Sequence, residues 1–492
     1  LRNLLDAAVL EHVELREGFV GSGEYAKIDE LPFDFARRRM SVVMADAEGR
    51  VLICKGAVDE TLDCCVSFEL KGEVYPLTEA KRAEAQSLAR SLGGDGFRVL
   101  ALGYRRLPSL GHGPVYAVAD ESELILVGFL AFYDPPKATA REALSQLKGH
   151  AVAVKVLTGD SDAVATSICR QVGMAAERVL LGSEIEAMSD EELAEAADRV
   201  EVFARLSPTH KERIVRALKS RGRVVGFLGD GINDAPALKA ADVGISVDSA
   251  VDIAKESSDI VLLENSLMVL DAGVTEGRRV FGNMMKYIKM AASSNFGNMF
   301  SVLGASLFLP FVPMLHIQVL ANNFLYDLSQ TAIPTDSVDE DWLAAPRRWD
   351  IAEIRRFILG IGPLSSIFDY LTYFIMIRFF GGWNNPALFR TGWFIESIFT
   401  QTLIIHVIRT KKIPFIQSRA SRPLMLASAA VLLAAASLPY SPLAPALGLV
   451  ALPPLYWAFL AGMILSYLAL TQAVKNRFNR SAQASPSLLA QH

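Results

Sequence analysis

Cysteine is scarce in this sequence, with four residues in 492, and none shows the Cys-x-x-Cys spacing of a zinc site. The four residues are Cys54, Cys64, Cys65 and Cys169. This usage argues against a fold held by disulfides or zinc and favours buried or free thiols in a reducing cytosol. The sequence also lacks an excess of positive charge, because it contains 49 Lys and Arg residues and 54 Asp and Glu residues. That balance gives no support for nucleic acid as a partner.

A starting Met and a signal peptide are also lacking, and residues 1–5 read like the middle of a helix. We therefore expect this chain to be part of a longer protein. At 492 residues it is too long for one ordinary domain, and its length is typical of about three units.

Apolar and charged residues are unevenly distributed. Residues up to about 285 carry most of the charge, whereas the remainder is dominated by long apolar stretches. Each stretch is near the ~20 residues that cross a bilayer. We expect six membrane helices, at 290–309, 312–333, 356–378, 392–408, 423–440 and 452–473.

Basic residues crowd two segments of the apolar half. They lie between the fourth and fifth expected spans and after the sixth, as Arg409, Lys411, Lys412, Arg419, Arg422, Lys475, Arg477 and Arg480. The positive-inside rule places both segments, the soluble half and the C-terminus in the cytoplasm. The polar tail at 479–492 is expected to be disordered.

Strand-like and helix-like runs alternate between about residues 137 and 265. The strand candidates are Val152–Leu157, Val202–Ala204, Val224–Leu228, Val243–Ser246 and Ile260–Leu263. This alternation predicts a parallel α/β sheet with its chemistry at the carboxyl ends of the strands. Residues 1–130 mix helices and short strands, and a Pro pair at 135–136 marks the boundary.

Two motifs follow strand candidates in this region. Residues 229–236 read Gly-Asp-Gly-Ile-Asn-Asp-Ala-Pro, and Thr158-Gly159-Asp160 ends an apolar run upstream. Glycines allow close approach of the backbone to a ligand, and carboxylates are hard oxygen ligands that Mg²⁺ prefers. A Gly-Asp-Gly string alone is a common turn. The whole string, continuing Ala-Leu-Lys-Ala-Ala-Asp-Val-Gly-Ile to residue 245, resembles the hinge signature of P-type ATPases.

This resemblance implies a haloacid-dehalogenase-like phosphorylation domain. Phosphoryl transfer needs Mg²⁺ and cations or hydrogen-bond donors that neutralise the developing negative charge. Thr158 would donate its hydroxyl to a phosphoryl oxygen, and Lys211, otherwise an ordinary surface lysine, would supply a positive charge. Asp230 would bind Mg²⁺. Matching positions in the family assign catalytic roles to Thr158, Gly159, Asp160, Lys211, Asn233 and Asp234, and metal binding to Asp230 and Asp234.

The phosphorylated aspartate of the family is lacking. No Asp-Lys-Thr-Gly-Thr string occurs in the sequence, and neither does the Thr-Gly-Glu motif that hydrolyses the phosphoenzyme. We therefore expect the missing N-terminal half of the same protein to supply both, and we predict that this chain alone is inactive.

The first domain resembles the ATP-binding domain of the same family. The resemblance implies that Phe33 stacks on adenine, while Arg38 and Lys55 steady the base and phosphates. Arg98 matches an arginine near the triphosphate, and Asp6 matches an acid near the adenine amine. An aromatic residue and a lysine in such a domain are otherwise ordinary core and surface residues.

Polar residues in the first two expected spans indicate an ion site. Asn295 and Asn298 are three residues apart, and Asn323 and Asp327 are four apart, so each pair shares a helix face. A carboxylate inside a span is costly and points to function. The asparagines alone would also fit a structural ladder between helices. The surrounding motifs resemble bacterial magnesium-transporting P-type ATPases, which implies Mg²⁺ as the transported cation.

The predicted fold is therefore α/β plus a membrane all-α part. The expected domains are a nucleotide-binding domain at 1–130, a phosphorylation domain at 131–285, a six-helix membrane domain at 286–478 and the tail. The predicted function is ATP-driven Mg²⁺ import across a bacterial inner membrane. The alternatives are a pump for Ca²⁺ or H⁺, a non-catalytic truncated membrane protein, and a phosphatase fused to helices, which the missing nucleophile disfavours.

Overall fold

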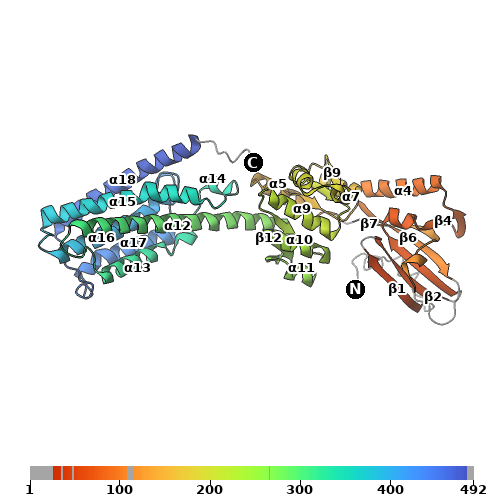
Figure 1. Cartoon of the computed structure of the whole chain (residues 1–492), viewed down its shortest axis with the longest axis horizontal. Helices are drawn as coiled ribbons and strands as arrows, with labels where there is room; N and C mark the ends of the chain where they lie inside the picture. The colour runs from red at the N-terminus through yellow and green to blue at the C-terminus, as the bar shows by residue number, and fades with distance from the viewer. Residues whose placement is uncertain are drawn as a thin grey trace. The chain divides into compact units, whose positions relative to one another are not determined.

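The structure is a computed structural model that describes residues 26–34, 37–46, 49–107, 116–133, 135–264 and 266–484. The predicted adenine contact Asp6 lies outside these ranges. Contacts divide the chain into two compact units. The first unit comprises residues up to Lys148 and Ala153–Asp271, and the second comprises Gly149–Val152 and residues from Ala272 onward. Figure 1 labels the elements of both units.

The described residues in the N-terminal part of the first unit form a seven-stranded sheet, against which helices α3 and α4 pack. Its strand order is β1-β2-β3-β6-β7-β4-β5, and every neighbouring pair is antiparallel except β4 and β7. Buried apolar side chains of β2, β3, β7 and helix α3 form the core. The strands and helices are β1 Ala26–Asp34, β2 Arg39–Asp46, β3 Gly49–Gly56, α3 Val58–Leu62, β4 Cys65–Leu70, β5 Glu73–Pro76, α4 Glu79–Gly94, β6 Phe97–Leu107, η1 Val118–Asp120 and β7 Leu124–Tyr133.

The rest of the first unit alternates short parallel strands with helices. Parallel pairing is confirmed, but the strands form two sheets of three, ordered β8-β10-β9 and β11-β12-β13. The elements are α5 Ala140–Gly149, β8 Val156–Leu157, α6 Asp162–Gln171, β9 Val179–Leu181, α7 Gly182–Ala187, α8 Asp190–Arg199, β10 Val202–Ala204, α9 Pro208–Ser220, β11 Gly226–Leu228, η2 Ile232–Asp234, α10 Ala235–Ala240, β12 Val243–Val247, α11 Asp252–Glu256 and β13 Ile260–Leu262.

The strand expected at 152–157 is shorter than predicted. Only Val156 and Leu157 form β8, because only these residues find ladder partners, Val202 and Phe203 of β10. Among the described residues, β8 and β11 each pair with a single strand. Leu157 and Val225 nevertheless pack against the cores of both sheets. The two sheets therefore belong to one packed body, in which β8 is an edge strand of one sheet and β11 an edge strand of the other.

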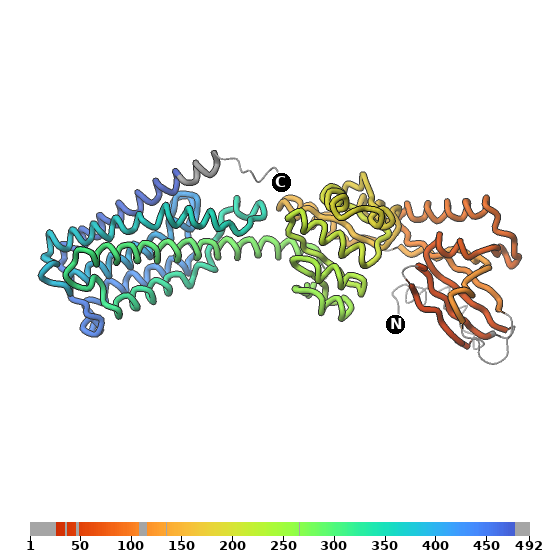
Figure 2. The backbone as a smooth tube through the Cα atoms, viewed as in Figure 1, coloured from red at the N-terminus to blue at the C-terminus, as the bar shows by residue number. Residues whose placement is uncertain are grey.

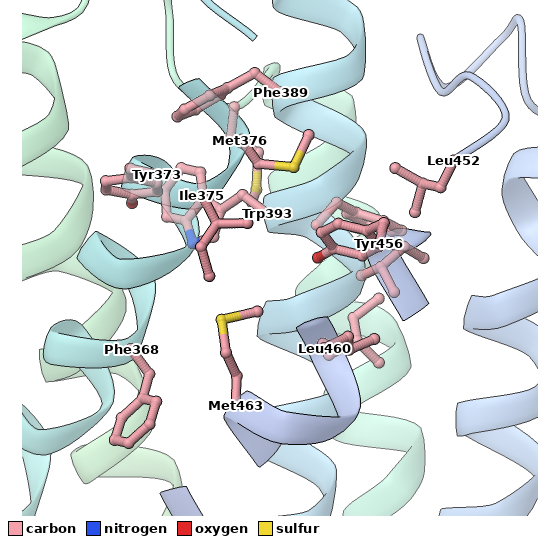
Figure 3. Close-up of a cluster of buried hydrophobic side chains, with 14 of the residues drawn as sticks. Phe368, Tyr373, Ile375, Met376, Phe389, Trp393, Leu452, Tyr456, Leu460 and Met463 are labelled. Carbon is pink, nitrogen blue, oxygen red and sulfur yellow. The ribbon is translucent and has the colours of Figure 1, made fainter. Parts of the chain in front are cut away.

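The second unit is a helical bundle. Figure 2 follows α12 as one unbroken helix. Aromatic side chains pack between the helices, as for Tyr373 and Trp393, whose ring centroids lie 4.9 Å apart (Figure 3). The elements are α12 Leu267–Phe308, α13 His316–Gln330, η3 Ile333–Thr335, α14 Glu340–Leu343, α15 Ile351–Phe380, α16 Pro386–Ile408, α17 Arg422–Ser437, η4 Leu438–Tyr440 and α18 Pro454–Ala484.

Four described helical segments are long and apolar enough to cross a membrane: Ile351–Phe380, Pro386–Ile408, Arg422–Tyr440 and Pro454–Arg477. The expectation of six such helices is met only in part. The span expected at 312–333 contains α13, which has only 15 residues. The span expected at 290–309 forms the end of the longer α12 and is interrupted by serines and asparagines.

A buried acid joins several chain segments at one end of the bundle. The carboxylate of Asp336 accepts hydrogen bonds from Lys286 at 2.8 Å, from Arg409 at 3.0 Å and from the backbone N–H of Ser421 at 3.0 Å. Lys475 of α18 donates to the carbonyl oxygens of Val407, Thr410 and Lys412. Two of the basic residues used to predict orientation, Arg409 and Lys475, thus also hold the helix ends together.

Candidate functional site

The loop after β8 carries the first predicted motif, Thr158-Gly159-Asp160. The hydroxyl of Thr158 donates to Oδ2 of Asp160 at 3.0 Å and accepts from the Asp160 backbone N–H at 3.1 Å. The backbone N–H groups of Arg205 and Leu206 donate to the carbonyl oxygens of Asp160 and Thr158 at 2.8 and 3.1 Å. The loops that follow β8 and β10 are therefore fixed to each other.

Helix α9 begins directly after that contact and presents Lys211. The Ser207 hydroxyl caps the helix by accepting from the N–H of His210, and Pro208 occupies the first turn. Nζ of Lys211 donates to Oδ1 of Asp234 at 2.7 Å, and only 14% and 10% of the two side chains is exposed. This pair connects the first motif, through α9, with the second.

The second motif forms a tight turn after β11. Oδ2 of Asp234 accepts from the N–H of Gly231 at 3.2 Å, and a Cβ at Gly229 would lie 2.5 Å from Cβ of Asp234. Residue 229 must therefore be glycine. The Ser246 hydroxyl donates to the Gly229 carbonyl at 2.9 Å, and the Val251 N–H donates to the Asp230 carbonyl at 3.1 Å. The backbone is thus held on both sides.

This arrangement separates the two motif acids. Asp230 is exposed at the carboxyl end of β11, whereas Asp234 is buried and both its oxygens already accept hydrogen bonds. Asn233 is half-buried beside them. Of the two predicted metal ligands, Asp230 has the open carboxylate, and Asp234 orients Lys211. No group of three or more His, Cys, Asp or Glu suited to a metal ion occurs in the described ranges, so Mg²⁺ at Asp230 would need other oxygen ligands.

The predicted nucleotide-contacting residues fall on one part of the seven-stranded sheet. Phe33 on β1 is 50% exposed, Lys55 on β3 is half-buried, and Arg38 adopts a positive φ of 50° in the turn before β2. A guanidinium nitrogen of Arg38 donates to the Arg205 carbonyl at 2.9 Å. Arg98 of β6 pairs with Asp160 at 2.8 Å. Two predicted nucleotide contacts thus touch the loops after β8 and β10.

Arg205 was not predicted as part of this site. It has a positive φ of 55°, and its guanidinium group lies 3.5 Å from Asp59 and 3.4 Å from Asp162. It stands in the string Phe-Ala-Arg-Leu-Ser-Pro-Thr-His-Lys at 203–211, from which only Lys211 was selected. The sequence offered one signal for Arg205, because this residue lies just before the helix that carries Lys211.

Glu121, a buried acid that contacts the turn containing Arg38, was also not predicted from the sequence. Glu121 accepts hydrogen bonds from Arg37 at 2.7 Å, Arg39 at 2.9 Å and the Ser41 hydroxyl at 2.7 Å. Burial by itself would raise the pKa of Glu121, but the hydrogen bonds from Arg37, Ser41 and Arg39 outweigh it and lower the pKa. Arg37 also donates to the Pro32 carbonyl at 2.8 Å. The Glu121 cluster thereby holds both Pro32, next to Phe33, and the turn that contains Arg38.

In the second unit the predicted polar crevice does not form among the described residues. Asn323 and Asp327 are exposed on α13, and Asn295 is exposed on α12. The buried polar face of α13 carries Asn322, Tyr326, Ser329 and Gln330 instead. Successive helical residues are 100° apart, so a buried Asn322 turns Asn323 and Asp327 away from the interior. The predicted placement of Asp327 in a crevice is therefore wrong for this unit.

Asn298 is the one predicted transport residue with a described interhelical hydrogen bond. Its Oδ1 accepts from Nε2 of Gln401 on α16 at 3.0 Å. Gln401 also donates to the Ser397 hydroxyl, which accepts in addition from Nδ2 of Asn322 at 3.0 Å. A polar seam thus links α12, α13 and α16 inside the bundle. Two buried acids of the unit, Asp369 on α15 and Glu396 on α16, were not predicted.

Two protein families match separate parts of this chain. The family described as "P-type ATPase, cytoplasmic domain N" matches residues 8–139, and the family described as "Cation transporting ATPase, C-terminus" matches residues 311–477. The chain belongs to the P-type ATPases.

Among curated proteins, the chain is 52% identical over 484 residues to "Magnesium-transporting ATPase, P-type 1" of Escherichia coli K12, covering 98% of this chain and 54% of that protein. The protein of the same name from Salmonella typhimurium 14028s is also 52% identical, with 98% and 53% covered. "Calcium-transporting ATPase 1" of Bacillus cereus is 31% identical over 369 residues, covering 73% of this chain and 41% of that protein. The chain spans about half the length of its magnesium-transporting relatives.

Proposed function

We propose that this chain forms part of an ATP-driven pump that carries Mg²⁺ into the cytoplasm across the bacterial inner membrane. The observation that carries the proposal is the buried Lys211–Asp234 pair beside the exposed carboxylate of Asp230. Identity of 52% to magnesium-transporting relatives, against 31% to a calcium-transporting one, favours Mg²⁺ over Ca²⁺. A pump for Ca²⁺ or H⁺ is the alternative.

The proposed division of labour follows three regions. Residues 1–130 bind ATP, residues 131–285 form a haloacid-dehalogenase-like phosphorylation domain, and residues 286–478 cross the membrane with six helices, including α13 and the end of α12. In the first region Phe33 stacks on the base, Lys55 and Arg38 contact the nucleotide, Arg98 lies near the triphosphate, and Asp6 lies near the adenine amine.

The phosphorylation domain would act through preorganised charge. The Asp234 carboxylate orients Lys211, so its ammonium group needs no rearrangement to stabilise negative charge on a phosphoryl oxygen. Thr158 offers a hydroxyl, Gly159 leaves room beside it, Asp160 accepts from that hydroxyl and Asn233 borders the turn. Mg²⁺ bound at Asp230 would neutralise charge on the transferring group.

The acceptor aspartate would come from a further strand. β8 and β11 each leave one edge free among the described residues, and each ends at one of the two motifs. A parallel strand between them would unite the two sheets. It would also bring its own carboxyl end to Thr158 and Asp230. We propose that the phosphorylated aspartate lies at that end.

In the membrane, we propose that Asn295, Asn298, Asn323 and Asp327 line the Mg²⁺ path. Amide and carboxylate oxygens suit Mg²⁺, which keeps part of its water shell. Asn295, Asn323 and Asp327 would meet the ion on the surface of α12 and α13 that the described residues leave uncovered.

The phosphorylation step can be tested in the full-length protein that contains this chain. The measurement is hydroxylamine-sensitive phosphoenzyme formed from ATP. Lys211→Met should slow its formation by about 100- to 1000-fold, the usual cost of losing one preorganised donor. Asp230→Asn should also block it while leaving ATP binding unchanged.

Lys219→Met is the matched control, because this lysine lies on the same helix but pairs with Asp242. It should form phosphoenzyme like the wild type. Normal phosphorylation in Lys211→Met or Asp230→Asn would reduce the two motifs to structural turns and would refute the proposed site.

The transported ion needs a separate test, because Mg²⁺ also accompanies ATP. Growth of an uptake-deficient host on low Mg²⁺ should be rescued by the wild-type gene and not by Asp327→Asn, provided both proteins reach the membrane. Rescue by Asp327→Asn would remove that residue from the ion path. Uptake of Ca²⁺ instead of Mg²⁺ by the wild type would favour the alternative pump.

A further inference from the structure

Asp369 of α15 and Glu396 of α16 place two acids in the interior of the helical unit. Only 3% of Asp369 and none of Glu396 is exposed. An isolated ionised carboxylate in such surroundings is strongly disfavoured unless a cation or a proton neutralises it. The pair therefore requires an explanation that the proposed pump residues do not supply.

The two acids differ in their hydrogen bonds. The Asp369 carboxylate accepts from the Ser301 hydroxyl at 2.6 Å and from the indole N–H of Trp393 at 2.7 Å. Among the described residues, neither oxygen of Glu396 accepts a hydrogen bond of ordinary geometry, and the nearby Thr400 hydroxyl donates instead to the Glu396 backbone carbonyl at 2.9 Å. Two donors stabilise negative charge on Asp369, whereas nothing comparable stabilises it on Glu396.

Helical geometry brings the two carboxyl groups together. Glu396 follows Trp393 by three residues, so both project from the same face of α16. Trp393 already donates to Asp369, so the face of α16 that carries Glu396 is the one that meets Asp369. If both were ionised, two acceptors with like charge would face each other with no proton to bridge them.

Among the described residues, the surroundings of the pair offer no cation to share between the acids. The titratable groups that face the pair are the tyrosines Tyr370, Tyr373, Tyr456 and Tyr467 from α15 and α18. Figure 3 shows Tyr373 and Tyr456 among the apolar side chains around Trp393. In the described parts of the chain, neither Asp369 nor Glu396 forms an ion pair, whereas Asp336 in the same unit pairs with Lys286 and Arg409.

We propose that Asp369 and Glu396 form a proton-binding site. Glu396 is held as a carboxylic acid and donates its O–H to the carboxylate of Asp369. One proton satisfies an otherwise unpartnered group and leaves a single negative charge, which Ser301 and Trp393 already stabilise. The ligand is a proton and does not depend on which cation the protein transports.

A proton fits this site better than a divalent metal ion. No described cluster of three or more metal-ligating side chains includes these residues. The Ser301 hydroxyl and the Trp393 N–H point their hydrogens at the Asp369 oxygens and occupy directions that a metal would need. A proton needs only two acceptor oxygens, which the pair supplies.

The site joins two helices, so its proton depends on their packing. The O–H bond to Asp369 crosses from α16 to α15. If the helices separate, the hydrogen bond breaks and the proton of Glu396 can pass to water, forming hydronium and leaving a second carboxylate. When the helices close again, one proton is taken back from water. The site therefore couples proton release to helix movement.

Infrared spectroscopy of the full chain in lipid nanodiscs at neutral pH tests the site directly. A carboxylic acid has a C=O stretching band that a carboxylate lacks. We expect this band in the wild type, its loss in Glu396→Gln and its retention in Asp327→Asn, which removes an exposed acid. Asp369→Asn should keep the band but shift it, because the acceptor of the Glu396 proton changes.

Isotope labelling keeps the test decisive if a variant fails to fold. In the wild type, ¹³C in glutamate side chains should shift the band, and ¹³C in aspartate side chains should leave it in place. Absence of the band in the wild type, its persistence in Glu396→Gln, or a shift with labelled aspartate alone would overturn the proposal. Loss of the band on adding Mg²⁺ at constant pH would identify a metal site instead. None of these measurements requires ATP hydrolysis, so they stand apart from the proposed pump activity.

Discussion

Both units bury carboxyl groups, but they neutralise them differently. In the first unit, Glu121 faces two arginines and a hydroxyl. In the second unit, Asp369 accepts from two neutral donors, and the Glu396 carboxyl accepts no hydrogen bond of ordinary geometry among the described residues. Removing a charge from water is costly in either place. Ion pairs offset that cost for Glu121 and hold a turn in place. The Asp369–Glu396 pair has no such cation in the described part of the chain, and we propose that an exchangeable proton neutralises it.

The second unit also contains the first kind of arrangement. Asp336, at one end of the bundle, is neutralised by Lys286 of α12 and by Arg409, which directly follows α16. The contrast is therefore between acids that stabilise the structure by pairing with cations and acids that remain able to bind and release a proton. Stability measurements on matched substitutions can sharpen or break this distinction.

The largest effect is expected at Asp336. Asp336→Ala leaves Lys286 and Arg409 buried without a counter-charge, and breaking a buried pair in this way usually costs about 3–5 kcal/mol. The apparent melting temperature of the full chain in detergent should fall sharply. Asp341→Ala, at an exposed position of the following short helix, is the control and should melt like the wild type. Equal melting of both variants would show that the cluster does not hold the helix ends.

A smaller loss is expected at Glu121. Glu121→Gln keeps one acceptor oxygen but removes the charge opposite Arg37 and Arg39, and a hydrogen bond to a charged group is worth about 1.5–3 kcal/mol. Hydrogen exchange in β2 and β3 should become faster. Glu123→Gln alters a more exposed acid that pairs with Arg105 and should leave exchange unchanged. Unchanged exchange in Glu121→Gln would contradict a cation-neutralised role.

The Glu121 cluster should also make the first unit sensitive to acid. Because the folded pKa of Glu121 is lowered, its stabilising contribution is complete above the ordinary glutamate pKa and is lost as pH falls through the folded value. Protection of the β2 and β3 amides in the wild type, corrected for the intrinsic pH dependence of exchange, should therefore fall once the pH drops below the ordinary glutamate pKa. Glu121→Gln should lack this component, so an identical pH dependence in both proteins would contradict it.

The smallest effect on stability is expected at Glu396. Gln resembles the protonated acid in shape and can still donate to Asp369, so Glu396→Gln should melt at or above the wild-type temperature. Glu396→Ala, which removes the donor and leaves a cavity, should melt lower. A large loss in Glu396→Gln would mean that this residue carries its negative charge in the folded protein, and the contrast with Asp336 would disappear.

Several features could be predicted from sequence because they depend on neighbouring residues. The string at 229–245 and Thr158-Gly159-Asp160 are local, so they indicated the class of protein and most of the strands that carry them. Apolar runs predicted the four helices now recognised as candidate spans. The lengths of the short strands were harder to predict, because the extent of β8 depends on its pairing with β10 rather than on its own composition.

The sequence by itself therefore determined the P-type class, the motif residues and the candidate spans, since each is written in contiguous residues or in composition. Only the tertiary structure decided that Asp234 orients Lys211, because those residues are 23 positions apart and meet through α9. It also decided that α13 buries Asn322 and exposes Asp327, a difference of helix rotation set by packing. The Asp369–Glu396 pair arises in the same way, from two helices whose contact no local pattern specifies.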